Sequence, residues 1–224
     1  MFIDKSMTRD VLTVRPETGI LAAQTLMAQN RIRHRPVVVE DDILVGIVTD
    51  RDIRSAMPAS ILSEAEKASE ERRLAFMKVK DIMTANPVTV SPAQTLEDAL
   101  LMMQNLKVGA FPVVDPEGKL KGIISMRDLT RAFVNVLGLQ EPGALIGIVV
   151  ENEQGQMKKI VDAITEQGVS FGSILVSRVW DEGKRAVFPY LLTSNISKVK
   201  NHLRERGFTL LDPMEWYLDR LPKR

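Results

Sequence analysis

Cysteine is absent from the 224-residue chain, which excludes disulfides, thiolate metal sites and thiol nucleophiles. A strong charge of either sign is missing too, because 30 basic and 29 acidic residues leave a formal net charge of +1. That balance argues against a strongly basic nucleic-acid surface. The longest apolar stretches, such as Leu145–Val150, are too short for a bilayer, and Met1–Lys5 form no apolar signal region. We therefore expect a cytoplasmic protein with no nucleic-acid or membrane partner.

Recognisable catalytic and metal-binding motifs are missing as well. The chain contains no Gly-x-Ser-x-Gly, no Walker-type loop and no His-Glu-x-x-His. Its two histidines, His34 and His202, are far apart and have no cysteine beside them, a pattern that does not favour zinc. The sequence predicts no catalytic residue, no metal site and no required cofactor.

What the chain does have is an internal duplication. Residues 6–56 recur as 82–132 at a constant offset of 76, and 16 of the 51 positions are identical. Average residue usage would give about three identities by chance. A unit of about 50 residues is marginal alone because it buries too little surface. We therefore expect the two copies to share one core and to leave paired clefts that bind ligands.

Each repeat alternates strand and helix patterns. In the first copy we predict strands at 11–14, 35–39 and 44–49 and helices at 16–30 and 50–57. In the second copy, Ser91 is the predicted N-cap of the long helix, with Pro92 first and Gln94 third, and 115–118 form a tight turn. Mixed Glu and Arg residues between the copies predict a solvated helical connector.

The pattern changes after the segment 138–143. An apolar strand at 144–150 precedes an amphipathic helix at 156–167 that ends at Gly168. A hairpin at 173–193, a helix capped by Asn195 or Ser197 and a strand at 208–211 complete the order βαββαβ, which is the ferredoxin-like arrangement. The fold class is α+β throughout. The predicted boundaries are 1–57 for repeat 1, 58–78 for the connector, 79–137 for repeat 2, 138–143 for a linker, 144–218 for the last domain and 219–224 for a tail.

A hydroxyl and an acid three residues apart follow an apolar strand in both copies. Thr49 precedes Asp52, and Ser125 precedes Asp128. One interpretation is a capping box, in which the hydroxyl and the acid satisfy each other's backbone amides. The other is a ligand site, in which the carboxylate accepts from vicinal ribose hydroxyls and the hydroxyl meets phosphate. Both hold if the acid turns outward to a cleft.

Four ordered motifs recur twice: Met-Thr (7–8, 83–84), Thr-Val-x-Pro (13–16, 89–92), Pro-Val-Val, and Gly-h-h-Ser/Thr-x-x-Asp, where h is an apolar residue. On these motifs the repeat resembles a CBS domain, and the pair over roughly 1–135 resembles a Bateman module with an intramolecular pseudo-twofold. The resemblance implies that Asp52 and Asp128 hold ribose and that Thr49 and Ser125 approach phosphate. Adenosine nucleotides (AMP, ADP, ATP) or a related adenosyl compound are the implied ligands.

The family's segment before the proline lines the adenine slot. Here that segment is Arg33-His34-Arg35 in one copy and Gly109-Ala110-Phe111 in the other. If the run from Arg31 is extended, its three arginines share one face and His34 lies on the other. Guanidinium groups suit phosphate, so we predict unequal sites, the more cationic one favouring ADP or ATP; a solvated basic rim is the alternative. The sequence leaves open which cleft receives the arginines.

The last 75 or so residues resemble an ACT domain. The family's Asp-x-Pro-Gly-x-Leu turn corresponds to 152–157, so Asn152 and Gly155 are the weak candidates for an amino-acid site. Asn replaces the family's Asp, and its Pro is absent. The order CBS–CBS–ACT resembles the acetoin utilization protein family, which is tied to acetoin or acetate metabolism.

These observations favour a regulatory binding protein without catalysis. We expect a nucleotide ligand, a homodimer and a metabolic-enzyme partner. Two alternatives stay open: an interaction scaffold with degenerate clefts, and a small-metabolite enzyme, for which the chain supplies no recognisable nucleophile, base and orienting group together.

Overall fold

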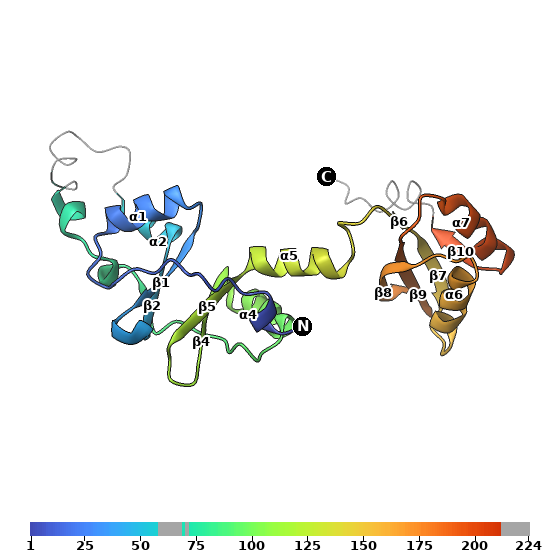
Figure 1. The fold of residues 1–224 in the computed structure, drawn as a ribbon, viewed down its shortest axis with the longest axis horizontal. Helices are drawn as coiled ribbons and strands as arrows, with labels where there is room; N and C mark the ends of the chain where they lie inside the picture. Colours follow the sequence, from blue (N-terminus) through green and yellow to red (C-terminus); the bar gives the residue numbers. More distant parts are fainter. Residues whose placement is uncertain (58–68, 70–71, 212–224) are drawn as a thin grey trace. The chain divides into compact units, whose positions relative to one another are not determined.

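The computed structural model describes residues 1–57, 69 and 72–211. The chain divides into two compact units, Met1–Thr130 and Arg131–Arg224 (Figure 1). Helices and β-sheets occur in both units, as the α+β prediction requires. Of the predicted connector at 58–78, residues 72–76 are helical, whereas 58–68 and 70–71 lie outside the described residues, as does the predicted tail at 219–224. No helix in the described part of the chain is both long enough and apolar enough to cross a membrane.

The first repeat is a β-hairpin covered by two helices. Its strands are β1 (His34–Val38) and β2 (Leu44–Thr49), and its helices are α1 (Ile20–Gln29) and α2 (Asp50–Ala56). Alternate residues of the two strands enter one core with residues from both helices. That core contains Val14, Ala23, Met27, Val37, Val48, Ile53 and Val79. The strand predicted at 11–14 is reduced to one parallel bridge between Val14 and Val37.

The second repeat has the same plan. Its strands are β4 (Ala110–Val114) and β5 (Leu120–Ser125), and its helices are α4 (Leu96–Leu106) and α5 (Met126–Val136). The predicted turn between β4 and β5 is confirmed, because Gly118 has a φ of +81° and Asp115 accepts from the Lys119 amide at 2.8 Å. Short 3₁₀ turns complete the unit: η1 (Ile3–Lys5), η2 (Glu40–Asp42) and η3 (Val79–Asp81).

Helix α4 starts four residues later than the sequence predicts. Thr95 is its N-cap. Asp98 completes a capping box, because its amide donates to the Thr95 hydroxyl and its carboxylate accepts from the Thr95 amide. The predicted cap, Ser91, instead accepts from the Ala93 amide at 3.3 Å and closes a separate turn with Gln94. Both Ser91 and Thr95 are followed three residues later by a side chain that can complete a capping box, Gln94 and Asp98 respectively. Thr95 directly precedes the buried apolar residues of α4.

The two repeats exchange their N-terminal segments. The amide and carbonyl of Thr8, near the start of repeat 1, each bond Ile123 of repeat 2 at 2.9 Å. In the opposite direction β3 (Thr84–Ala85), near the start of repeat 2, pairs with β2 of repeat 1. Each hairpin is therefore completed by the segment that leads into the other copy, which explains how two units too small to fold alone share one domain.

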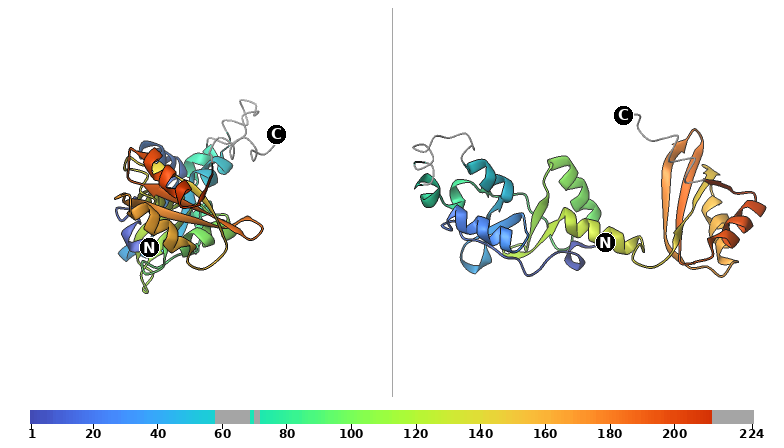
Figure 2. Two further views of the ribbon diagram at one scale, coloured as in Figure 1. Left: turned by 90° about the vertical axis from the view of Figure 1, so that its right-hand side faces the viewer. Right: turned by 90° about the horizontal axis from the view of Figure 1, so that it is seen from above.

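The elements of the second unit follow the order βαββαβ. The sheet is antiparallel in the order β10-β7-β9-β8, and α6 and α7 lie on the same side of it (Figure 2). The elements are β6 (Ala144–Leu145), β7 (Gly147–Glu151), α6 (Gln156–Thr165), β8 (Phe171–Asp181), β9 (Lys184–Leu191), α7 (Ile196–Glu205) and β10 (Thr209–Leu211). The ferredoxin-like order is thus present, although the strand predicted at 144–150 is interrupted at Ile146.

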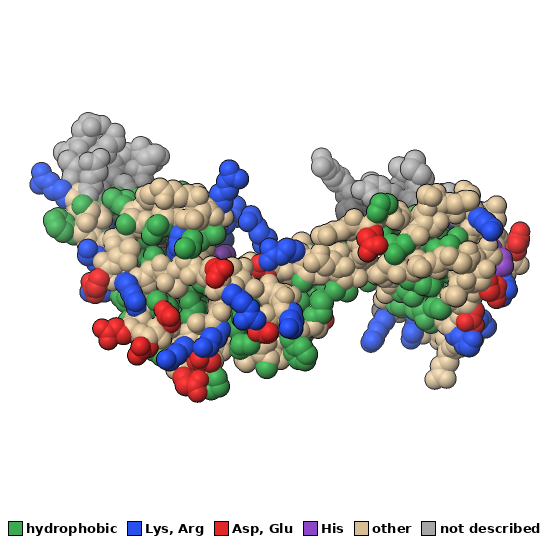
Figure 3. Space-filling model, viewed as in Figure 1, with side chains coloured by type: hydrophobic (Ala, Val, Ile, Leu, Met, Phe, Trp, Pro, Cys, Tyr) green, Lys and Arg blue, Asp and Glu red, His purple; other side chains and the backbone are tan. Residues whose placement is uncertain are grey.

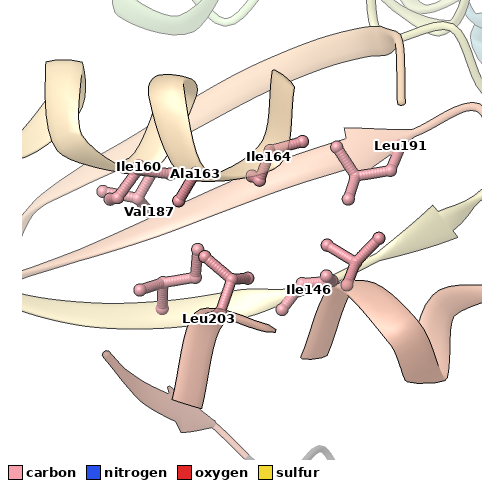
Figure 4. Packing of buried hydrophobic residues seen from close by; sticks show 9 residues of the cluster. Ile146, Ile160, Ala163, Ile164, Val187, Leu191 and Leu203 are labelled. Carbon is pink, nitrogen blue, oxygen red and sulfur yellow. The ribbon is translucent and has the colours of Figure 1, made fainter. Parts of the chain in front are cut away.

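The core of this unit lies between the sheet and its two helices. Ile160, Ala163 and Ile164 of α6 approach Val187 and Leu191 of β9 (Figure 4). The helix ends at Thr165, two residues before the predicted end, and Gly168 adopts a φ of +67° in the turn that follows. Aliphatic residues at helical spacing in α6 and at alternate positions in β9 account for this packing.

Candidate functional site

The hydroxyl–acid motif of the first repeat forms the junction between β2 and α2. Thr49 Oγ1 accepts from the Asp52 amide at 3.2 Å, and Asp52 Oδ2 accepts from the Thr49 amide at 2.8 Å and from its hydroxyl at 2.7 Å. The capping-box interpretation is therefore confirmed here. Both hydrogen bonds to the carboxylate use Oδ2, and Oδ1 of Asp52 accepts no hydrogen bond from the described residues.

The motif of the second repeat has the same local geometry but a different environment. Asp128 Oδ2 accepts from the Ser125 amide at 2.9 Å and from its hydroxyl at 2.5 Å. Its other oxygen, Oδ1, accepts from the Thr8 hydroxyl at 3.4 Å. Only 5 % of Asp128 is exposed, whereas Asp52 is half-buried. The two acids are therefore equivalent in sequence and unequal in access.

A cleft of about 620 Å³ lies beside Thr49 and Asp52. That volume is within the range of small-molecule sites. The first repeat contributes Arg33, His34, Ile47, Thr49, Asp50, Arg51, Asp52 and Arg54. The second contributes Thr84, Pro87, Val88 and residues 106–112, which include the predicted site residues Gly109, Ala110 and Phe111. Both copies therefore build one cleft. Ser125 and Asp128 are not part of its lining.

One wall of this cleft is apolar and open. Val88, Leu106 and Val108 line it and are 49 %, 49 % and 38 % exposed. These residues come from the loop after β3 and from the end of α4, and the sequence did not point to them as site residues. The sequence signal that could have identified them is the presence of aliphatic residues, such as Val108, in a loop directly before a strand pattern. Their surfaces suit a flat, apolar group such as a nucleobase.

The polar side of the cleft is cationic. Arg54 is paired with Asp50 at 2.8 Å. Arg33, Arg51 and Lys107 line the cleft and form no ion pair with any residue that the structure describes. A solvated basic rim was one interpretation of Arg33. Because Arg33 lines the cleft, it also offers an anion a place to bind. Elsewhere on the face shown in Figure 3, basic and acidic side chains are interspersed.

His34 lies on the cleft face of β1, directly opposite Thr49 in the strand register. A Cβ atom at Gly109 would lie 3.1 Å from its Nε2, so the imidazole packs on the backbone of the second repeat. Burial lowers the pKa of His34, the neighbouring Arg33 lowers it further, and Asp52 acts in the opposite direction. The equivalent residue of the second copy is Ala110.

Arg35 does not belong to this cleft, contrary to the prediction. It pairs with Val48, a core residue, so its side chain enters the core of the first repeat and is only 1 % exposed. Arg31 has a φ of +52°, so the run is not extended throughout and the three arginines do not share a face. Burial lowers the pKa of Arg35, and its Nε and Nη2 find no hydrogen-bond partner. Phe111, its equivalent, has its side chain in the core of repeat 2.

The candidates in the second unit hold a loop together. The Asn152 amide donates to the Gly183 carbonyl at 2.8 Å, and Gly155 precedes α6 with a φ of +86°. Glycine adopts this left-handed conformation without a steric cost. The structure thus gives both residues a backbone role. Among the residues that it describes, no three His, Asp or Glu side chains are placed to hold a metal ion.

A family model for the CBS domain matches residues 3–59 and 79–135, about half of the chain. The chain belongs to the CBS-domain family. A CBS domain-containing protein from Dictyostelium discoideum is 33 % identical over 137 residues, which are 61 % of this chain and 94 % of that protein. The chain also matches inosine-5'-monophosphate dehydrogenases. It spans only 22 % to 37 % of the length of three of these enzymes.

Two solved structures share the fold of the CBS pair. CBSX2 of Arabidopsis thaliana, solved in complex with AMP, is 28 % identical, with a TM-score of 0.51 over 59 % of this chain and 96 % of its own. AcuB of Vibrio cholerae, a protein named for acetoin utilization, is 30 % identical, with a TM-score of 0.52 over 63 % of this chain and 98 % of its own. The resemblance to the CBS family is therefore confirmed.

Proposed function

We propose that this chain is a non-catalytic regulatory protein that binds an adenosine nucleotide in the cleft beside Thr49 and Asp52. The observation that carries the proposal is the composition of the cleft walls. Asp52 keeps one carboxylate oxygen for a ribose diol, and Val88, Leu106 and Val108 offer an apolar surface to a base. Arg33, Arg51 and Lys107 supply positive charge for phosphate.

A relative supports the class of ligand. CBSX2, which shares the fold of residues in the first unit, was solved with AMP. Among AMP, ADP and ATP, the cationic side chains favour the ligands with more phosphate. An adenosyl compound without phosphate would use the apolar wall and Asp52 and would leave the cations unpaired.

The test is a binding panel on the purified full chain. AMP, ADP, ATP, NAD and S-adenosylmethionine are compared by calorimetry and thermal shift, with GMP as the control for the base. A ligand that binds only the native state raises the free energy of unfolding by about 2.7 kcal/mol at a hundredfold excess over Kd. Failure of every adenine compound to bind would reject the proposal and favour an interaction scaffold. Turnover of a nucleotide, detected by chromatography, would favour an enzyme.

We further propose that occupancy of the cleft is transmitted through the second unit to a partner enzyme. The βαββαβ order of that unit resembles an ACT domain, and the likeness to AcuB favours acetoin or acetate metabolism as the regulated process. A homodimer is the proposed assembly, since cyclic dimers are the commonest soluble oligomers. Light scattering with and without AMP tests the assembly, and calorimetry with amino acids tests the ACT-like site.

A further inference from the structure

His34 is the feature of the cleft that the proposed function leaves unexplained. It occupies a position where the duplicated copy has Ala110, so the duplication did not require it. Its side chain faces the same cleft as Thr49 and rests against Gly109, which has no side chain to displace it. Among the described residues that line the cleft, this imidazole is the one group whose ordinary pKa lies near neutral pH.

The charged neighbours of His34 determine its protonation. Its own segment contributes Arg33, α2 contributes Asp50, Arg51, Asp52 and Arg54, and the end of α4 contributes Lys107. Asp50 is paired with Arg54, and Asp52 is engaged with Thr49. Burial and the neighbouring Arg33 oppose a charge on His34 and lower its pKa, whereas Asp52 acts in the opposite direction.

A phosphate in the cleft reverses this balance. Its negative charge offsets that of Arg33, which opposes protonation, and its oxygens add an acceptor for the imidazole N–H. The pKa of His34 then rises on binding, and the imidazole takes up a proton from solvent. An adenosine without phosphate brings no charge and gives no such rise.

We propose that His34 makes the cleft a proton-linked site that selects phosphorylated adenosine ligands over uncharged or sulfonium ones. The inference rests on the proposed function and deepens it. Because the bound state holds the additional proton, affinity rises as pH falls through the interval between the bound and the free pKa of His34. Above that interval the affinity does not depend on the protonation of His34. One fully linked proton changes Kd by at most about tenfold per pH unit.

The test is isothermal calorimetry of AMP and of adenosine with the full-length protein, in two buffers of different ionisation enthalpy. The difference between buffers gives the number of protons taken up. The phosphate of AMP titrates near pH 6 itself, so wild type is compared with His34→Gln, which keeps a polar side chain of similar size and cannot be charged. His202→Gln, in the other unit and outside the cleft, is the matched control.

We expect AMP to be bound with a larger proton uptake by wild type and H202Q than by H34Q, and adenosine to be bound with the same uptake by all three. The wild-type chain supplies a second readout, because the NMR pKa of the His34 ring should rise when AMP is added. Equal uptake by wild type and H34Q, or an unmoved ring pKa in the AMP complex, overturns the inference while the proposed function stands. If AMP and adenosine both fail to bind, the proposed function falls and this inference falls with it.

Discussion

The hydroxyl of Thr8 lies 3.4 Å from Oδ1 of Asp128 and donates to it from the opposite repeat. Thr84 is the equivalent of Thr8, and within the described residues it makes no such bond to Asp52. The duplication has therefore produced one acid whose second oxygen is taken and one whose second oxygen is available. Two sites of identical sequence motif are chemically unequal for this reason.

This inequality predicts the stoichiometry of binding. We expect about one AMP per chain, and we expect Asp52→Asn to weaken binding about 10- to 100-fold, because a hydrogen bond to a charged group contributes about 1.5–3 kcal/mol. Asp128→Asn is the matched control and should leave Kd unchanged, since its carboxylate is engaged by Ser125 and Thr8. Calorimetry measures both. Two equal sites in wild type, or a loss of binding in D128N alone, would contradict the assignment.

The buried guanidinium of Arg35 predicts a stabilising substitution. Its Nε and Nη2 are buried without a partner, and an unsatisfied buried donor costs about 1–3 kcal/mol. Arg35→Phe introduces the residue that the second copy has at position 111 and should raise the free energy of unfolding by a similar amount. Urea denaturation measures the change. AMP affinity should not change, because Arg35 does not line the cleft.

The reverse substitution is the control for Arg35. Phe111→Arg buries a cation in a core position and should lower the free energy of unfolding. A loss of stability in R35F would show that the guanidinium has an energetically important partner and would reject this explanation.

The sequence predicted features that depend on near neighbours in the chain. The hairpin turn at Asp115–Gly118 and the capping geometry of Thr49 and Ser125 both follow from a few adjacent residues. Features set by long-range contacts were not accessible. Nothing local indicates that Thr8 pairs with Ile123 or that Gly109 meets His34, so the sequence left open which segments build the cleft.

Two predictions failed where one local rule had two solutions. Residues 31–35 have strand-like alternation, yet the backbone is left-handed at Arg31 and β1 begins only at His34, so Arg33 lies outside the strand that contains Arg35. Both Ser91 and Thr95 satisfy the rule for an N-cap, and burial of Leu96 and Ala99 decides in favour of Thr95. Packing thus selects among alternatives that propensity leaves equal.

The start of α4 gives a prediction about that choice. Thr95→Ala removes a capping hydroxyl and should cost about 1 kcal/mol of stability, whereas Ser91→Ala should cost less because Ser91 caps no helix. The side-chain and backbone hydrogen bonds of Thr95 lower the pKa of Asp98. Their stabilising effect is present above the unfolded pKa of the carboxyl, near 3.8, and is lost as pH falls through the lower folded value.

The measurement for α4 is the free energy of unfolding of wild type, T95A and S91A at neutral and acid pH. The penalty of T95A should shrink as the solution is acidified below the unfolded pKa of Asp98. A penalty for S91A as large as that for T95A would place the working cap at Ser91.

The glycines that let the exchanged segments approach the hairpins predict an asymmetric response to alanine. A Cβ at Gly122 would lie 2.8 Å from the carbonyl oxygen of Thr8, which is fixed by its pairing with Ile123, and equally close to Met7 Sδ. At Gly46 the closest atom is Met83 Sδ, at 2.5 Å, and the Thr84 oxygen is 3.2 Å away. A thioether can rotate aside, whereas a paired backbone cannot. Gly122→Ala should therefore lower the free energy of unfolding by about 1–3 kcal/mol, and Gly46→Ala by less. Urea denaturation of the two variants compares them directly, and equal losses would mean that the two crossings are equally rigid.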